Sequence, residues 1–187
     1  MRSFEFAERI DEKTGAKVPG EKMFEEAQLP EYQTKYAAGA DFFCAEKVVV
    51  PSIWTQVLHS IRWCIGRRHS LALRKHVHSI EPTMVHTGIK ANMSDDEVLV
   101  ISNRSSGPLK RGLVLSNGIG VIDRDYYGNS KNDGEIMFAF YNFRLRDVTI
   151  EVGERIGQGM FQKVLRPEKG LRVKDDVREG GFGHTGV

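Results

Sequence analysis

Residues 116–129 read SNGIGVIDRDYYGN, a stretch in which a turn signal is followed by β-branched residues and then by acidic ones. Asn117-Gly118 is a dipeptide typical of hairpin turns, and a tight turn exposes backbone donors and acceptors that can imitate a base-pairing edge. Asp123 and Asp125 flank Arg124, so on a strand both carboxylates would face the same side. One carboxylate could then orient water as a general base. A solvated acidic loop is the alternative interpretation.

Strand-like runs extend outward from this stretch over most of the chain. Short runs of β-branched and aromatic residues, separated by Gly, Asn, Asp and Pro clusters, occupy 48–50, 98–101, 113–115, 136–138 and 148–150. Such spacing predicts an all-β sandwich or barrel. Residues 1–36 are rich in charge and interrupted by Gly and Pro, which indicates a first strand followed by an irregular surface segment.

One segment has helical periodicity. After Pro51-Ser52, apolar residues fall on one stripe at Trp54, Val57, Leu58, Ile61 and Ile65. This pattern predicts an amphipathic helix over residues 52–65, outside the β core. The helix runs into a stretch rich in Arg and His, so we interpret residues 52–83 as a solvated helical insertion. No nucleic-acid partner is expected, although the basic insertion leaves a protein or nucleic-acid partner open. His76 and His78 lack further ligands for a zinc site.

Composition sets the limits for these interpretations. The chain has 187 residues, of which 28% are charged and 40% hydrophobic, with a net charge of +2. These values are ordinary for a globular protein and predict a single domain over residues 1–187. No apolar run reaches the roughly 20 residues of a membrane span, so we expect a cytoplasmic protein with no membrane partner. Cys44 and Cys64 are too few for a disulfide framework and are expected to be buried free thiols.

A second polar stretch suits phosphate. Residues 103–107 combine the guanidinium of Arg104 with the hydroxyls of Ser105 and Ser106, next to a glycine that permits close backbone approach. Charge-assisted bonds and backbone amides are the groups that hold phosphate oxygens. A polar turn is the alternative.

Five segments taken together resemble the motifs of the trimeric dUTPase family, the deoxyuridine 5'-triphosphate nucleotidohydrolases. In chain order these segments are residues 38–42, 104–106, 120–128, 153–158 and 180–186. The likeness covers residues 37–187, and the long third segment is its most specific part. A phage type and a cellular type of dUTPase both fit.

The resemblance implies a jelly-roll-like β-barrel, a homotrimer with active sites at subunit interfaces, and hydrolysis of dUTP to dUMP and pyrophosphate with Mg²⁺. It implies that Asp123 activates the attacking water. Tyr126 would pack against the deoxyribose and exclude a 2′-hydroxyl, while Asn117 and the backbone near Val121 would read uracil.

The same resemblance assigns the triphosphate and the metal. Arg104, Ser105, Ser106 and Gln158 match triphosphate-binding positions. Asp41 matches an aspartate that reaches the metal through water, with Mg²⁺ held mainly by the substrate phosphates. A cluster of protein metal ligands is therefore not expected.

The glycine-rich end, residues 175–187, is implied to be a mobile lid. In that lid Phe182 would stack on uracil, and the phosphates would be bound by Arg178, Gly183, His184 and Thr185. His184 stands where the family usually has Ser or Thr. Arg178 lies closer to Phe182 than the usual arginine does, so Lys174 is an alternative phosphate contact.

Two other functions stay open. A dCTP deaminase shares this fold and its triphosphate chemistry, although the Asp-x-Asp-Tyr pattern of residues 123–126 fits the hydrolase better. A regulatory protein that uses its dUTP-bound state as a signal is conceivable because of the insertion.

Overall fold

The fold is mostly antiparallel β, as the sequence predicts. The structure is a computed structural model that describes residues 2–11, 13–66 and 80–169, without the side chains of residues 63–66. Its strands are β1 (Ser3–Phe6), β2 (Glu8–Ile10), β3 (Lys17–Lys22), β4 (Ala40–Phe43), β5 (Val48–Val50), β6 (Thr83–His86), β7 (Ile89–Asn92), β8 (Glu97–Asn103), β9 (Leu113–Leu115), β10 (Ile119–Asp123), β11 (Met137–Asn142), β12 (Val148–Ile150) and β13 (Arg155–Lys163). The helical elements are α1 (Ile53–Gly66), a π-helical turn (Gly107–Arg111) and a 3₁₀ turn (Arg124–Tyr126).

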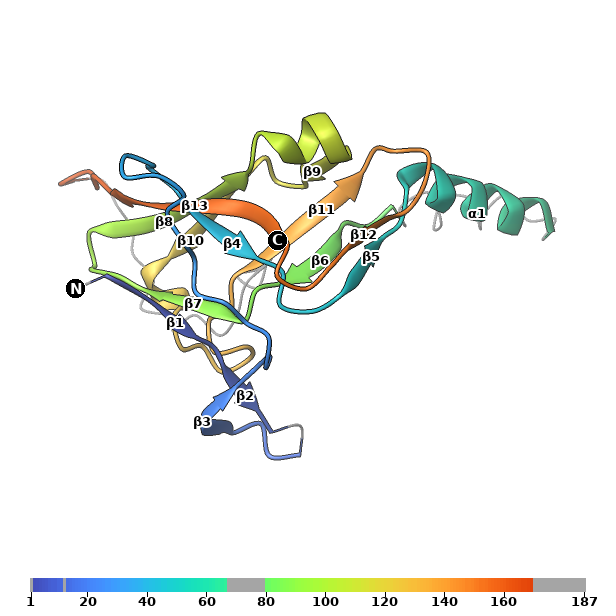
Figure 1. Cartoon of the computed structure of the whole chain (residues 1–187). Helices are drawn as coiled ribbons and strands as arrows, with labels where there is room; N and C mark the ends of the chain where they lie inside the picture. Colours follow the sequence, from blue (N-terminus) through green and yellow to red (C-terminus); the bar gives the residue numbers. More distant parts are fainter. Residues whose placement is uncertain (1, 12, 67–79, 170–187) are drawn as a thin grey trace.

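The largest sheet has the strand order β10-β8-β13-β4, and all its pairs are antiparallel. A second sheet has the order β6-β11-β9, and two-stranded pairs form between β1 and β7, β5 and β12, and β2 and β3. Figure 1 shows the β2–β3 pair extending below the other strands, and the β5–β12 pair on the side where α1 begins. Within the largest sheet, β10 and β4 lie at opposite edges, which separates the functional segments that they carry.

Aromatic rings fill the core between the sheets. Phe42, Phe138 and Phe140 are almost completely buried, and the rings of Phe42 and Phe138 lie 5.6 Å apart between centroids. Gly157 on β13 lies directly against Phe138, because a Cβ at this position would come 2.0 Å from its Cε1. Close packing of this kind leaves no room for a side chain.

The turn at Asn117-Gly118 is present, but the hairpin expected there is wrong. Gly118 has a φ of +69°, and its N–H donates to the Leu115 carbonyl at 3.0 Å. However, β9 pairs with β11 whereas β10 pairs with β8, so the two strands on either side of the turn enter different sheets. They therefore diverge after the turn and leave space between them.

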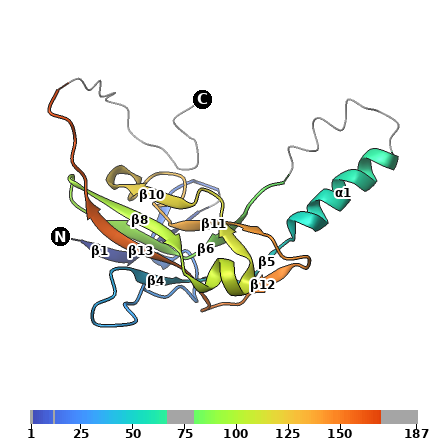
Figure 2. The same cartoon turned by 90° about the horizontal axis from the view of Figure 1, so that it is seen from above.

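Helix α1 forms where the sequence predicts a helix. Its start is capped by Ser52, whose Oγ accepts a hydrogen bond from the Trp54 N–H at 3.1 Å and donates one to the Arg144 carbonyl at 2.5 Å. Figures 1 and 2 both show α1 projecting away from the sheets beyond β5. Trp54, Leu58 and Ile61 are about half exposed in this chain, so the helix contributes little to the β core.

The N-terminal segment is more regular than expected. β2 and β3 form an antiparallel pair with a register shift between Glu8 and Ile10, in a stretch read as irregular because of its charge. Charged residues are poor strand formers on average, but pairing and tertiary contacts override that preference. Among the described residues, no helix has the length and apolar character that crossing a bilayer requires.

Candidate active site

A cavity of about 150 Å³ lies where β9 and β10 diverge. Its walls come from β8, β9, β10 and β11, and they include Asn117, Val121 and Tyr126. These are the three described residues to which the sequence assigned uracil and deoxyribose, and the structure brings them around one space. Because β10 is an edge strand, alternate backbone N–H and C=O groups along it face away from β8.

Asp123 is the last residue of β10 and is exposed. Its backbone is extended, with φ −77° and ψ 157°, and the chain then turns into the 3₁₀ segment Arg124–Tyr126. Asp125 therefore lies on a helical turn, and the expectation that it shares a strand face with Asp123 is wrong. The same turn carries Tyr126 inward, where its side chain is buried at the cavity.

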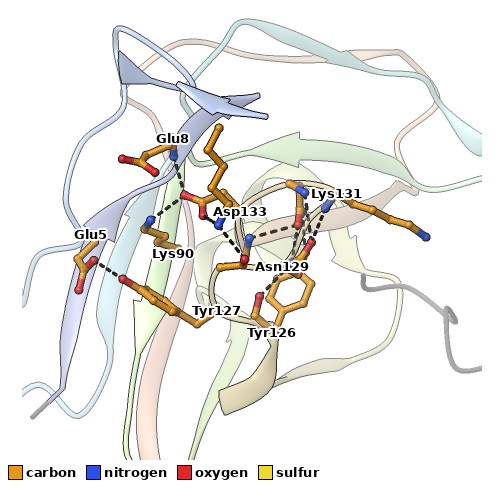
Figure 3. Close-up of polar contacts among 12 residues, drawn as sticks. Glu5, Glu8, Lys90, Tyr126, Tyr127, Asn129, Lys131 and Asp133 are labelled. Carbon is orange, nitrogen blue, oxygen red and sulfur yellow. Dashed lines mark hydrogen bonds and ion pairs between the residues drawn. The ribbon is translucent and has the colours of Figure 1, made fainter. Parts of the chain in front are cut away.

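Tyr126 and Tyr127 both take part in the polar network of Figure 3. The Tyr126 hydroxyl donates to the Glu135 carbonyl at 2.9 Å. The Tyr127 hydroxyl donates to the Glu5 carboxylate at 2.5 Å, and this bond raises the pKa of Tyr127 to about 12. Both phenols therefore have defined hydrogen-bond partners, and that of Tyr127 stays protonated at neutral pH.

Asp133 anchors the loop that follows these tyrosines (Figure 3). Its fully buried carboxylate lies 2.5 Å from Lys17 Nζ and 2.7 Å from Lys90 Nζ, and it accepts the Glu8 N–H at 2.8 Å. Burial alone would raise the pKa of Asp133, but the bonds from Glu8, Lys17 and Lys90 outweigh burial and lower it. The loop is thus tied to β2, β3 and β7 through one charged centre.

A separate cluster holds several of the predicted triphosphate and metal residues. Asp41 Oδ2 on β4 lies 3.2 Å from Arg104 Nε and 3.4 Å from Arg155 Nη1. Gln158 is the cross-strand partner of Asp41. Ser102 lies beside the cluster, with its Oγ 3.5 Å from Gln158 Nε2.

A bulge brings Arg155 into this cluster. Residues three apart on a regular strand point to opposite faces, yet both Arg155 and Gln158 lie on the side of Asp41. The register between β13 and β4 shifts between Arg155 and Gly157, and one extra residue restores the common face. Arg155 lies within the fourth motif segment, residues 153–158, but no role was predicted for it because the local sequence has no signal for a bulge.

The cluster borders a second cavity of about 430 Å³. Its lining includes Ser106 and the cationic side chains Arg104, Lys110, Arg111 and Arg155, together with Glu154, which pairs with Arg111. A cavity with this charge suits a polyanion. Ser105 is exposed and does not contribute to the lining.

One chain does not bring Asp123 close to Asp41. Across the sheet, Asp41 pairs with Gln158, Gln158 pairs with Ser102, and Ser102 pairs with Ile119. Ile119 is the first residue of β10 and Asp123 is the last. Three strand spacings of about 4.8 Å and four residue steps of about 3.3 Å therefore separate the two aspartates, which places their backbones roughly 20 Å apart. The two cavities of one chain share no lining residue.

The donor set fits a metal that takes most of its ligands from elsewhere. The described residues contain no group of three or more His, Cys, Asp or Glu side chains that could hold an ion. Asp41 is a single carboxylate between two arginines. Mg²⁺ commonly binds with one or two carboxylates, several waters and substrate phosphates, which agrees with this arrangement.

The remaining predicted residues lie outside the described part of the chain: Lys174, Arg178, Phe182, Gly183, His184 and Thr185. Cys44 is a buried free thiol as expected, and burial raises its pKa, whereas the side chain of Cys64 is not described.

The fold is an antiparallel β fold with two separate cavities, one of them lined by several cationic side chains, and comparison with known proteins gives the family. The dUTPase family model matches residues 70–186. A deoxyuridine 5'-triphosphate nucleotidohydrolase of Hydrogenobaculum sp. is 32% identical over 169 residues, which is 89% of this chain and 95% of that protein. This chain belongs to the dUTPase family.

Two further relatives agree with that assignment. A deoxyuridine 5'-triphosphate nucleotidohydrolase of Lactococcus lactis subsp. lactis is 45% identical over 107 residues, covering 57% of this chain and 71% of that protein. The crystal structure of dUTPase from Streptococcus mutans has 30% identity and a TM-score of 0.61, over 89% of this chain and 98% of that chain.

Proposed function

We propose that this chain is a dUTP diphosphatase, which hydrolyses dUTP to dUMP and pyrophosphate. The observation that carries the proposal is the cavity beside the end of β10. There Asn117, the backbone near Val121 and the buried ring of Tyr126 surround one space, with Asp123 at the end of the same strand. Membership of the dUTPase family supports the same reaction.

Recognition of the base follows from the turn and the edge strand. Asn117 and the outward backbone groups of β10 would pair with the polar edge of uracil. Cytosine would leave those groups unpaired, and discrimination by buried polar groups of this kind is strong. Exclusion of the thymine methyl group would depend on how closely the turn at Asn117 and the backbone of β10 surround the base.

In the proposed reaction Asp123 is the general base. Asp123 takes a proton from water while the water oxygen attacks the α-phosphorus in line with the bond to the bridging oxygen. That bond breaks, dUMP keeps the new oxygen, and pyrophosphate leaves with the electron pair.

The triphosphate would bind in the second cavity, beside the cluster of Asp41, Arg104 and Arg155. Arg104, Ser105, Ser106 and Gln158 would hold its oxygens, and Asp41 would contact Mg²⁺ through water. When bound, Mg²⁺ shares the negative charge of the phosphates. The ion pairs of Asp41 with Arg104 and Arg155 hold these side chains in place before substrate arrives.

A homotrimer would bring the Asp123 end of β10 in one chain next to the Asp41–Arg104 cluster of another chain. Since about 20 Å separates Asp123 from Asp41 along the sheet, a complete site needs Asp123 from one chain and the phosphate cluster from another. Ile119 and Val121 are more than half exposed on the outer face of β10. Exposed apolar residues of this kind are suited to a subunit interface.

The rest of the chain completes this arrangement. We propose one jelly-roll-like barrel domain over residues 1–187, with residues 52–83 inserted and residues 175–187 as a lid. Phe182 would cover the uracil, and Arg178, Gly183, His184 and Thr185 would close over the phosphates. Closure would exclude water and fix the triphosphate for attack.

A hydrolysis panel tests the proposal. Purified chain with Mg²⁺ is given dUTP, UTP, dTTP and dCTP, and pyrophosphate and ammonia are measured. We expect pyrophosphate from dUTP, far less from the other nucleotides, and no ammonia from dCTP. Asp123→Asn should lower turnover of dUTP by about 10²–10⁴, the usual contribution of a general base. Ammonia release from dCTP would instead identify a deaminase, and equal hydrolysis of dUTP and UTP would overturn the role given to Tyr126.

A further inference from the structure

We propose that Asn132 is a positioning residue that sets the discrimination between deoxyribose and ribose by fixing the hydroxyl of Tyr126. The inference rests on the proposed function, in which the Tyr126 ring occupies the space of a 2′-hydroxyl. It concerns a residue outside the five motif segments and outside the cavity lining.

The Tyr126 hydroxyl is held from two sides. It accepts a hydrogen bond from Asn132 Nδ2 at 2.7 Å and donates one to the Glu135 carbonyl at 2.9 Å. Asn132 Nδ2 also donates to that carbonyl at 3.3 Å, so the three groups form a closed triangle. Both the donor and an acceptor function of the phenol are thereby used, which fixes its position and its proton.

Asn132 is itself held in place. Its Oδ1 accepts hydrogen bonds from Asn129 Nδ2 at 2.8 Å and from the Gly134 N–H at 3.3 Å. Asn129 Nδ2 also donates to the Tyr126 carbonyl at 2.9 Å. Tyr126 is therefore tied to the same loop through its backbone by Asn129 and through its hydroxyl by Asn132.

The loop has little freedom to follow a displaced ring. Asp133, next to Asn132, is buried and paired with Lys17 and Lys90. Figure 3 shows Lys90 beside Asp133. Gly134 has a φ of +82°, and a Cβ there would lie 2.7 Å from the Tyr126 carbonyl oxygen. The loop thus packs directly on the turn that carries Tyr126, with charged anchors on β3 and β7.

This arrangement has a consequence for specificity. To admit a 2′-hydroxyl, the Tyr126 ring must move away from the sugar, and any such movement stretches the bonds of its hydroxyl to Asn132 and Glu135. A binding group held rigidly by its neighbours discriminates better than one that can shift. Loss of the Asn132 bond should therefore reduce the preference for dUTP over UTP. The contacts to the base and to the phosphates should stay in place.

The test uses Asn132→Leu, which is close to Asn in size and removes the donor to Tyr126 without offering a new hydrogen-bond partner. One net hydrogen bond corresponds to about fivefold in an equilibrium constant, so the ratio of kcat/KM for dUTP over UTP should fall by about fivefold. Tyr126→Phe removes this bond together with the bond to the Glu135 carbonyl, so it should lower the ratio at least as much. The double variant should lower the ratio no further than Tyr126→Phe alone, because that substitution already removes the bond to Asn132.

Lys131→Ala is the matched control, because Lys131 is an exposed neighbour in the same loop. It should keep the ratio of the unaltered protein. Calorimetric binding of the α,β-imido analogues of dUTP and UTP gives the same comparison without hydrolysis, and native mass spectrometry with thermal melting checks assembly and folding. If Asn132→Leu does not fold, Asn132→Ala removes the same donor with a smaller side chain and takes its place.

Three results would overturn the inference: equal losses of kcat/KM for both nucleotides, an unchanged ratio in Tyr126→Phe, or additive effects in the double variant. Failure of the proposed function has a different signature, because the unaltered protein would then not hydrolyse dUTP at all. A protein that hydrolyses dUTP selectively, but whose Asn132 variants keep that selectivity, would refute only the inference.

Discussion

Mixed trimers of two inactive variants should recover activity, because the two halves of the proposed site lie about 20 Å apart in one chain. The first variant is Asp123→Asn, which removes the proposed base from an exposed strand end. The second is Arg104→Ala, which removes a phosphate donor from the other cluster. Asp41 keeps Arg155 as a partner at 3.4 Å, so the second variant retains a compensated carboxylate and should fold.

The expected recovery follows from the symmetry of a trimer. Each variant alone should lose about 10²-fold or more of the rate, as is usual for a general base or for an electrostatic donor. When equal amounts are unfolded together and refolded, each site draws Asp123 from one chain and Arg104 from another. Each required residue is intact in half of the chains, so about a quarter of the sites should be complete.

The assay is pyrophosphate release from saturating dUTP, compared with each variant refolded alone. The matched control carries both substitutions in one chain and is mixed with unaltered chain. With sites shared between chains this mixture should show about a quarter of full activity, whereas sites built from a single chain would give about a half. Native mass spectrometry confirms that mixed trimers are present in both experiments.

The reasoning is refuted if mixed trimers form and the two single variants together remain as inactive as either alone. In that case Asp123 and Arg104 of each site would belong to the same chain. The separation of about 20 Å inferred from the strand register would then be wrong for the active protein. A control mixture with about half of the full activity would independently lead to the same conclusion.

Three further predictions concern stability and the insertion. Asp133→Asn should lower the free energy of unfolding in urea by about 3–5 kcal/mol, because Lys90 stays buried without its partner. Asn tolerates the φ of 55° at this position, so the backbone adds no strain. The control is Asp95→Asn, which breaks an exposed ion pair with Arg124 and should change the stability little. A drop no larger than that of the control would contradict the buried pair. The hydrogen bond to Glu135 raises the pKa of His86 above 6.5, so its stabilising contribution is complete below pH 6.5 and is lost as the pH rises through the higher folded value. The difference in Tm between His86→Gln and the unaltered protein should therefore shrink from about pH 5 to pH 9, and a constant difference would argue against this linkage. Replacing residues 53–82 by a short Gly/Ser linker should preserve dUTP hydrolysis, since α1 projects from the sheets while Ser52 and β6 are kept. An insoluble or inactive product would show that this segment belongs to the core or the site.

Local chemistry made much of this protein readable from its sequence. The β-branched runs predicted strands, Ser52 and the apolar stripe predicted a helix, and Asn117-Gly118 predicted a tight turn. Each of these signals acts over a few neighbouring residues, so no tertiary information is needed to interpret it. The order of the five motif segments also identified the family without a structure.

Relations between distant residues were decided only in the folded chain. The sequence gives no sign that β9 and β10 enter different sheets, that the chain leaves its strand at Asp123, or that a bulge turns Arg155 toward Asp41. Nor does it show that Asp133 lies between Lys17 and Lys90, residues 116 and 43 positions away along the chain. These features depend on strand register and on burial of charge, whose energies arise from contacts that form only when remote segments pack together.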